Sequence, residues 1–191
     1  MAIPVDSVTE RTLYLRSIVE RAGMQEVFGW NRPSDTDLAV FGRIITLYST
    51  IDFMLRFVAE LMDDLGMLQG KWAGKKQAFS MASVTAAVRS TAIWRESHNN
   101  AFDAIERHRA ARNVLAHFVI KQFPTEDAYI CMTKSASDFE QVFGLRPQTE
   151  DMLYGVMDAT QLRDVVPEVE RLAKWVSTLP EMFANPLQPE V

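Results

Sequence analysis

The chain has 191 residues, of which 48% are hydrophobic and 24% are charged, a balance typical of soluble globular proteins that excludes disordered and collagen-like chains. Twenty Lys and Arg residues against 25 Asp and Glu residues give a net charge of −5, which argues against a surface built throughout for nucleic acid or anionic lipid. The single cysteine, Cys131, cannot form an internal disulfide and favours a reducing compartment.

Helices are predicted for most of the first hundred residues. A helix capped by Ser7 or Thr9 runs to about Gly23, because a capping hydroxyl precedes apolar residues and a glycine follows them. A short second piece covers residues 24–30 and ends before Pro33.

A longer helix is predicted over residues 37–65. Side-chain oxygens in residues 34–37 can cap its free amides, and Gly66 stops it. Its apolar stripe has helical spacing and consists of Phe41, Ile45, Tyr48, Asp52, Leu55, Ala59 and Met62. A carboxylate on an apolar stripe is costly unless it is paired, so we expect Asp52 to meet an arginine, either Arg109 or Arg112.

The pattern changes in the second half of the chain. Helices over about 75–94 and from about 99 or 100 to 118 are followed by two β-rich runs, which predict a hairpin over about 118–133. Residues 135–156 contain glycine and proline and are expected to be irregular, and a final helix covers about 158–179.

These elements predict an all-α protein, an up-and-down bundle of four to five helices with a small appended β-hairpin. Pro167 should kink the last helix or mark its true first turn. Because no internal repeat and no long linker is found, we expect one domain over residues 1–180 and a flexible tail over residues 181–191.

The sequence also predicts a location. The first six residues lack the pattern of a secretory signal. The longest uncharged stretch, residues 77–88, is shorter than the roughly 20 apolar residues that a membrane-spanning helix needs. We therefore expect a cytoplasmic protein that does not bind membranes.

Basic residues gather late in the predicted fourth helix and just after it. Residues 107–125 contain Arg107, Arg109, Arg112 and Lys121 and no Asp or Glu, so this stretch carries +4 and the rest of the chain −9. Such a distribution argues against general coating of nucleic acid but suits the capture of one phosphate group at a small site.

Helical geometry gives this stretch two faces. Arg109, Asn113 and His117 lie on one face, whereas Arg112 is about 100° from Asn113 and about 140° from His117. Arg112 and His117 can therefore meet on one phosphate only through the reach of the arginine, fraying of the helix end, or a second copy of the helix. The opposite face is a packing stripe of Ala104, His108, Ala111, Leu115 and Phe118.

The segment Arg112-Asn113-x-x-x-His117 resembles the R-(polar)-x-H signature of the HEPN superfamily (higher eukaryotes and prokaryotes nucleotide-binding). The helical architecture, the arginines before the motif and the early acidic residue Asp52 are similar as well. The resemblance implies metal-independent RNA cleavage, with no metal and no cofactor. His117 would act as general acid or base, Arg112 would stabilise charge on the phosphoryl oxygens, and Asn113 would orient the phosphate or the imidazole.

The resemblance also implies partners. Arg107 and Arg109 would contact RNA phosphates or would form only a solvated charged face. Asp52 would orient the catalytic arginine or would only hold the bundle together. The attacking group would be the 2′-hydroxyl of RNA, which excludes DNA as a substrate. Two sites would face each other in a homodimer. The protein would act as a toxin or in defence, with an antitoxin or another protein as its partner. Val119 stands where the nucleotidyltransferase-paired toxins carry a modified tyrosine, so inactivation by that route is not supported.

Other interpretations stay open at this stage. The chain could be a non-catalytic helical module for dimerisation or partner binding, in which Arg112, Asn113 and His117 form a hydrogen-bonded buttress. It could also bind a nucleotide or another ligand in a dimer cleft. Whether it is an enzyme is therefore undecided, but a His117 sealed in the core would exclude the ribonuclease interpretation, whereas exposure of His117 and Arg112 in a shared cationic cleft would support it.

Overall fold

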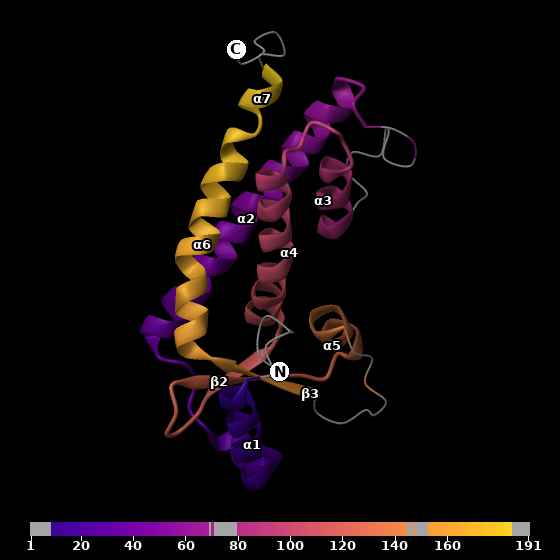
Figure 1. Cartoon of the computed structure of the whole chain (residues 1–191). Helices are drawn as coiled ribbons and strands as arrows, with labels where there is room; N and C mark the ends of the chain where they lie inside the picture. The colour runs from indigo at the N-terminus through magenta and orange to yellow at the C-terminus, as the bar shows by residue number, and fades with distance from the viewer. Residues whose placement is uncertain (1–8, 69, 71–79, 145–146, 148–152, 185–191) are drawn as a thin grey trace. The chain divides into compact units, whose positions relative to one another are not determined.

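A computed structural model of the chain describes residues 9–68, 70, 80–144, 147 and 153–184. The described part is mostly helical and has a small antiparallel sheet with the strand order β1-β2-β3 (Figure 1). Its elements in chain order are α1 (Glu10–Gly29), α2 (Asp35–Asp64), α3 (Met81–Arg89), α4 (Glu96–His117), β1 (Val119–Gln122), β2 (Ala128–Thr133), α5 (Ala136–Phe143), β3 (Leu153–Asp158), α6 (Ala159–Thr178) and α7 (Glu181–Ala184).

The chain divides into two units, each built from two separate stretches. Unit 1 comprises residues 1–45 and 107–168, and unit 2 comprises residues 46–106 and 169–191. Helices α2, α4 and α6 each begin in one unit and end in the other. The expectation of a single domain over residues 1–180 stays a prediction.

The local signals at the first two helices act as expected. Thr9 forms a capping box with Thr12 at the start of α1, and Gly23 interrupts the helix with a φ of +73°, a conformation that favours glycine. The cap of α2 is reciprocal, since the amide of Asp37 donates to Ser34 Oγ and the amide of Ser34 donates to the Asp37 carboxylate. Gly66, with a φ of +67°, follows the end of α2.

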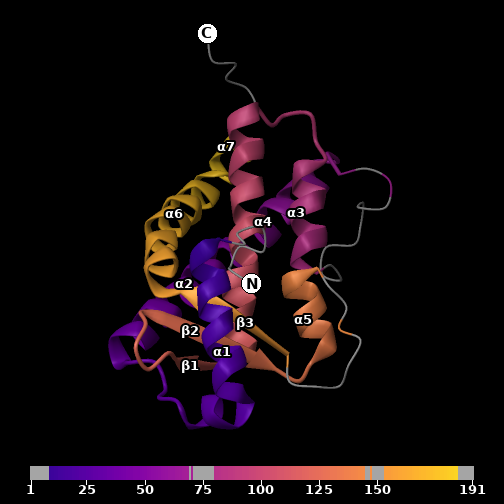
Figure 2. The same ribbon diagram turned by 60° about the horizontal axis from the view of Figure 1, so that its bottom comes forward.

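The central strand of the sheet in unit 1, β2, is buried on both faces. Ala128, Ile130 and Met132 of β2 belong to a core cluster with Leu15 and Val19 of α1, and Figure 2 shows α1 lying across the sheet. Every residue of β2 is buried, as expected for a central strand covered on both sides.

The other face of the sheet packs against different helices. The ring of Tyr129 lies edge-on to Phe41 of α2, with 5.2 Å between the centroids. Phe143 of α5 lies so close to Gly155 of β3 that an added Cβ would be 2.6 Å from its ring. Glycine is therefore required at position 155 by close approach rather than by backbone conformation.

Unit 2 has its own aromatic core. The rings of Trp94 and Phe102 are 5.3 Å apart, and those of Phe102 and Trp175 are 5.2 Å apart. Tyr48 is fully buried and donates a hydrogen bond of 2.8 Å to the carbonyl of Ile105. A buried hydroxyl thus finds the partner that it needs.

Several expectations require correction. The hairpin is confirmed as β1 and β2, but the region 135–156 is not irregular, because it contains α5 and most of β3. Ser135 and Gly144 cap α5 at its two ends, and β3 completes a three-stranded sheet in place of a hairpin alone. Pro167 lies inside α6 and does not mark its first turn.

Other element boundaries also differ. Helix α3 ends at Arg89 rather than near 94, and residues 75–79 lie outside the described part. Residues 181–184 of the expected tail form α7, in which Phe183 is buried, because an apolar side chain is available to cover the unit 2 core. Residues 185–191 lie outside the described part.

The apolar stripe of α2 is rotated slightly from the predicted one. Phe41, Tyr48, Leu55, Ala59 and Met62 are buried as expected, together with Ile44, Ile51 and Val58. Ile45 and Asp52 are only half-buried, because they lie at the edge of the stripe. By length and composition alone, α2 is also long and apolar enough to cross a membrane, a property that core helices of soluble proteins share.

Candidate functional site

The predicted site residues lie in the second half of α4. The packing stripe of this helix is buried as expected, with exposed fractions of 9% or less for its five members, which are Ala104, His108, Ala111, Leu115 and Phe118. Burial of this stripe fixes which side of α4 reaches solvent. His117 is the last residue of the helix and is exposed, so it is not sealed in the core.

Arg112 and Asn113 are half-buried one turn before His117. Arg112 Nη1 donates a hydrogen bond of 3.2 Å to Asn113 Oδ1. Arg112 Nε is buried and has no hydrogen-bond acceptor in the described part of the chain. Within unit 1, no described carboxylate pairs with this guanidinium, so its charge is not neutralised there.

The two further arginines have different environments. Arg107 is exposed, whereas Arg109 is half-buried. Both arginines lie in unit 1, on the helix that carries the motif. Asp52, the predicted supporting carboxylate, lies in unit 2 and is half-buried, and its role stays a prediction.

Positively charged side chains are favoured at the C-terminal end of α4. His117 lies in the last turn, where the carbonyl end of the helix dipole interacts favourably with positive charge. Lys121 of β1 donates to the carbonyl of Trp30 at 3.0 Å, which holds this neighbouring cation to the α1 end. Arg112 and Lys121 are cations that would attract an anion such as a phosphate group, whereas the carbonyl end of the helix itself opposes one.

His108 has a structural environment. It is 5% exposed, and its Nε2 lies 2.9 Å from the Glu168 carboxylate of α6. Its burial among the packing residues of α4 makes His108 part of the unit 1 core, although its Nε2 makes no hydrogen bond of good geometry to Glu168.

Sequence reasoning missed a cluster around Arg163. This residue makes a bidentate contact with Asp127, at 2.7 and 2.9 Å, and a longer contact of 3.4 Å with Asp37. Burial raises the pKa of Asp37, but hydrogen bonds from Ser34, Tyr129 and Arg163 outweigh it and hold that pKa below the usual value. Arg163 likewise lowers the pKa of Asp127.

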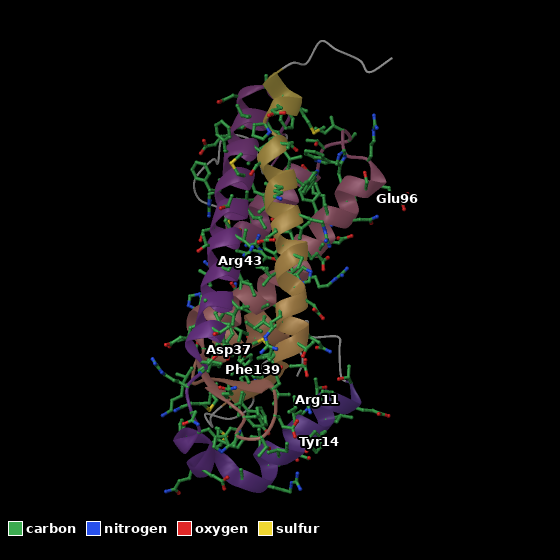
Figure 3. All side chains as sticks on the ribbon, turned by 90° about the vertical axis from the view of Figure 1, so that its left-hand side faces the viewer. Arg11, Tyr14, Asp37, Arg43, Glu96 and Phe139 are labelled. Carbon is green, nitrogen blue, oxygen red and sulfur yellow. The ribbon has the colours of Figure 1, made fainter. Side chains whose placement is uncertain are left out.

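A second cluster joins α1 to the sheet. Arg11 contacts Glu126 at 2.6 Å and Asp158 at 3.2 Å, and Tyr14 donates to Glu126 at 3.1 Å. Arg11 and Tyr14 lie on the same stretch of α1 (Figure 3). The partners are more than 100 residues apart in sequence, so no local pattern could have revealed them. Both clusters fasten the β1–β2 turn, and their carboxylates are occupied by arginines.

A metal site is not apparent in the residues that the structure describes, where no group of three or more His, Cys, Asp or Glu residues is placed to hold an ion. Cys131 is buried in β2, and burial raises the pKa of its thiol, so it is not a reactive nucleophile.

Comparison with known proteins adds no assignment: no family model, no curated protein and no solved structure matches this chain.

Proposed function

We propose that this protein is a HEPN-like, metal-independent RNA-cleaving or RNA-binding protein in which Arg112 and His117 act together. The observation that supports the proposal is the exposure of His117 on the same helix end as an arginine whose charge no described unit 1 carboxylate neutralises. The helices would form an up-and-down bundle, and two copies would bring their sites together in a homodimer. A toxin or defence role in the cytoplasm, with an antitoxin as partner, would accompany this activity.

In this proposal His117 takes the proton of the RNA 2′-hydroxyl or gives one to the leaving oxygen, because an imidazole changes its charge near neutral pH. Arg112 stabilises the negative charge that develops on the phosphoryl oxygens. Asn113 holds the guanidinium in place through the hydrogen bond to Arg112 Nη1. Arg107 and Arg109 contribute phosphate contacts.

The test is RNA digestion in the presence of a chelator. His117→Ala should lower the cleavage rate about 10²- to 10⁴-fold, and Arg112→Ala about 10²- to 10³-fold. The matched control is Arg171→Ala, which alters an exposed arginine of unit 2 and should leave cleavage unchanged. An RNA with deoxyribose at the cleaved positions should resist the parent protein.

Equal cleavage by the parent, His117→Ala and Arg112→Ala would refute the catalytic assignment. The hydrogen bond from Arg112 to Asn113 favours a second candidate, a non-catalytic module in which these side chains only stabilise the helix end. In that case Arg112→Ala would lower the unfolding temperature and the parent would neither cleave nor bind RNA. If the parent binds RNA without cleaving it, and Arg107→Ala and added salt weaken this binding, the protein is an RNA-binding protein and not a ribonuclease.

A further inference from the structure

Unit 2 contains a pocket that its own side chains do not fill. The pocket has a volume of about 360 Å³ and lies between the end of α2 and α7. All of its lining residues belong to unit 2. They are Phe57, Leu61 and Asp64 of α2, Leu65 just after that helix, Pro180 just before α7, and Glu181 and Phe183 of α7. We call this cavity the α2–α7 pocket.

The walls of the α2–α7 pocket are mostly apolar, and the core of unit 2 supports them. Phe183 is 8% exposed, and its ring centroid lies 6.2 Å from that of the buried Trp94. Phe57 is 41% exposed, so its ring is accessible to a molecule in the pocket. Pockets for small molecules typically have volumes of about 300–1,000 Å³, apolar and aromatic walls, and a few polar groups that fix orientation. The α2–α7 pocket meets this description at the lower end of the size range.

The charged side chains at the pocket all have the same sign. The lining contains two carboxylate residues, Asp64 and Glu181, and no Lys, Arg or His. Asp64 already interacts within the chain. Glu181 is exposed, and no ion pair joins it to another described residue. Glu181 would therefore attract a cation in the pocket and repel an anion.

The backbone contributes to the same preference for a cation. Helix α2 ends at Asp64 and α6 ends at Thr178, so the carbonyl ends of two helices adjoin the lining residues. Figure 1 shows both helices ending on the side of unit 2 where α7 lies. The carbonyl end of a helix favours positive charge, and neither helix has a basic residue in its last turn. The face of an aromatic ring such as that of Phe57 also attracts cations.

We infer that the α2–α7 pocket binds a small amphipathic cation, an organic ammonium ion with an apolar body. The apolar body lies against Phe57, Leu61 and Phe183, and the ammonium group lies beside Glu181. This inference goes beyond the proposed function, because neither Arg112 nor His117 lines the pocket.

Three probes with the same eight-carbon chain, octylammonium, octanol and octanoate, test the inference at pH 7. Each is titrated into the full chain while the methyl NMR signals of Leu65 are followed, and the concentration dependence gives a dissociation constant. Octylammonium should bind most tightly, because only its head group is attracted by the carboxylates. Octanoate should bind about tenfold more weakly, since the attraction at an exposed carboxylate is replaced by repulsion.

Two substitutions test the head group. Glu181→Gln should weaken octylammonium binding about 3- to 5-fold and leave octanol binding unchanged, because it removes a charge and keeps the side-chain size. Glu96→Gln is the matched control. Glu96 is also an exposed carboxylate in the first turn of a helix of unit 2, but it does not line the pocket. This control should change the binding of neither probe.

Two further substitutions test the apolar walls. Phe57→Leu keeps an apolar side chain and removes the ring, so it should weaken octylammonium binding more than octanol binding. Leu61→Trp places a larger side chain in the pocket and should weaken the binding of all three probes at least about tenfold. Leu61 is only half-buried, so this variant should keep the circular dichroism spectrum of the parent.

Octanol or octanoate binding as tight as that of octylammonium would overturn the inference. Methyl shifts that Leu61→Trp leaves unchanged would overturn it as well, since they would reflect contact with exposed apolar surface. So would the absence of any shift up to about 10 mM octylammonium. A chain that binds octylammonium but does not cleave RNA would leave this inference standing while the proposed function failed. A chain that cleaves RNA but does not bind octylammonium would give the reverse result.

Discussion

The hydrogen bond between Tyr129 and Asp37 gives the sharpest test of how unit 1 is held together. Tyr129 is 1% exposed and Asp37 is 5% exposed, and the carboxylate also accepts from Ser34 Oγ at 2.6 Å and from Arg163 at 3.4 Å. The hydroxyl of Tyr129 donates to this carboxylate, which contributes to the lowered pKa of Asp37. Burial, followed by the same hydrogen bond, raises the pKa of Tyr129, so the phenol stays a donor.

Tyr129→Phe removes the donor and leaves the ring in place. A hydrogen bond to a charged group contributes about 1.5–3 kcal/mol, so we expect a loss of that size in the free energy of unfolding at pH 7. In an Asp37→Asn background the acceptor is neutral, its bond contributes about 0.5–1.5 kcal/mol, and the same substitution should cost about 1 kcal/mol less. Urea unfolding followed by circular dichroism measures all four proteins, and hydrogen exchange of the β2 amides reports on unit 1 alone.

The dependence on pH follows from the lowered pKa of Asp37. A carboxylate with a depressed folded-state pKa contributes stability above its unfolded value near 4, and this contribution disappears as the pH falls through the folded value. The cost of Tyr129→Phe should therefore shrink on acidification below about pH 4. A substitution that costs under about 0.5 kcal/mol at pH 7, or the same amount in the Asp37→Asn background, would refute the reasoning.

Two further predictions concern unit 1. Gly155→Ala should cost about 1–3 kcal/mol in thermal unfolding because its Cβ would meet the ring of Phe143, and Phe143→Leu should relieve part of that cost. Gly144→Ala is the matched control: it should cost about 1 kcal/mol through its φ of +65°, with no relief from Phe143→Leu. Arg163→Gln removes the bidentate contact with Asp127, but because Arg163 is 43% exposed the loss should be about 0.5–1 kcal/mol at pH 7. Since the pKa of Asp127 is lowered, that loss should vanish below about pH 4, and a cost independent of pH would contradict the assignment.

The features that could be predicted from the sequence are those with local causes. Thr9, Gly23 and Ser34 mark helix ends through bonds to residues three positions away or through backbone conformation, and each acts in the structure as predicted. The β1–β2 hairpin is local too. Strand β3 was missed because its pairing to β2 joins residues 20 or more positions apart, and Gly155, which suggested a loop, is there to admit Phe143.

The candidate site shows the same division. The positions of Arg112, Asn113 and His117 on one helix follow from spacing, and so does the buried stripe opposite them. The clusters around Arg11 and Arg163 could not be predicted, because they join residues that are brought together only when the sheet forms.

The packing of α4 determines which side chains near its end reach solvent. Ala111, Leu115 and Phe118 are buried, and this fixes the rotation of the helix so that His117 faces solvent while Arg112 stays half-buried. The helix ends at His117 and an extended strand begins at Val119, so the imidazole lies where the backbone changes direction. The angle of about 140° between Arg112 and His117 on an ideal helix therefore applies to the full length of α4, without a frayed last turn. Of the three ways for these side chains to share a phosphate, the reach of the arginine and a second copy remain.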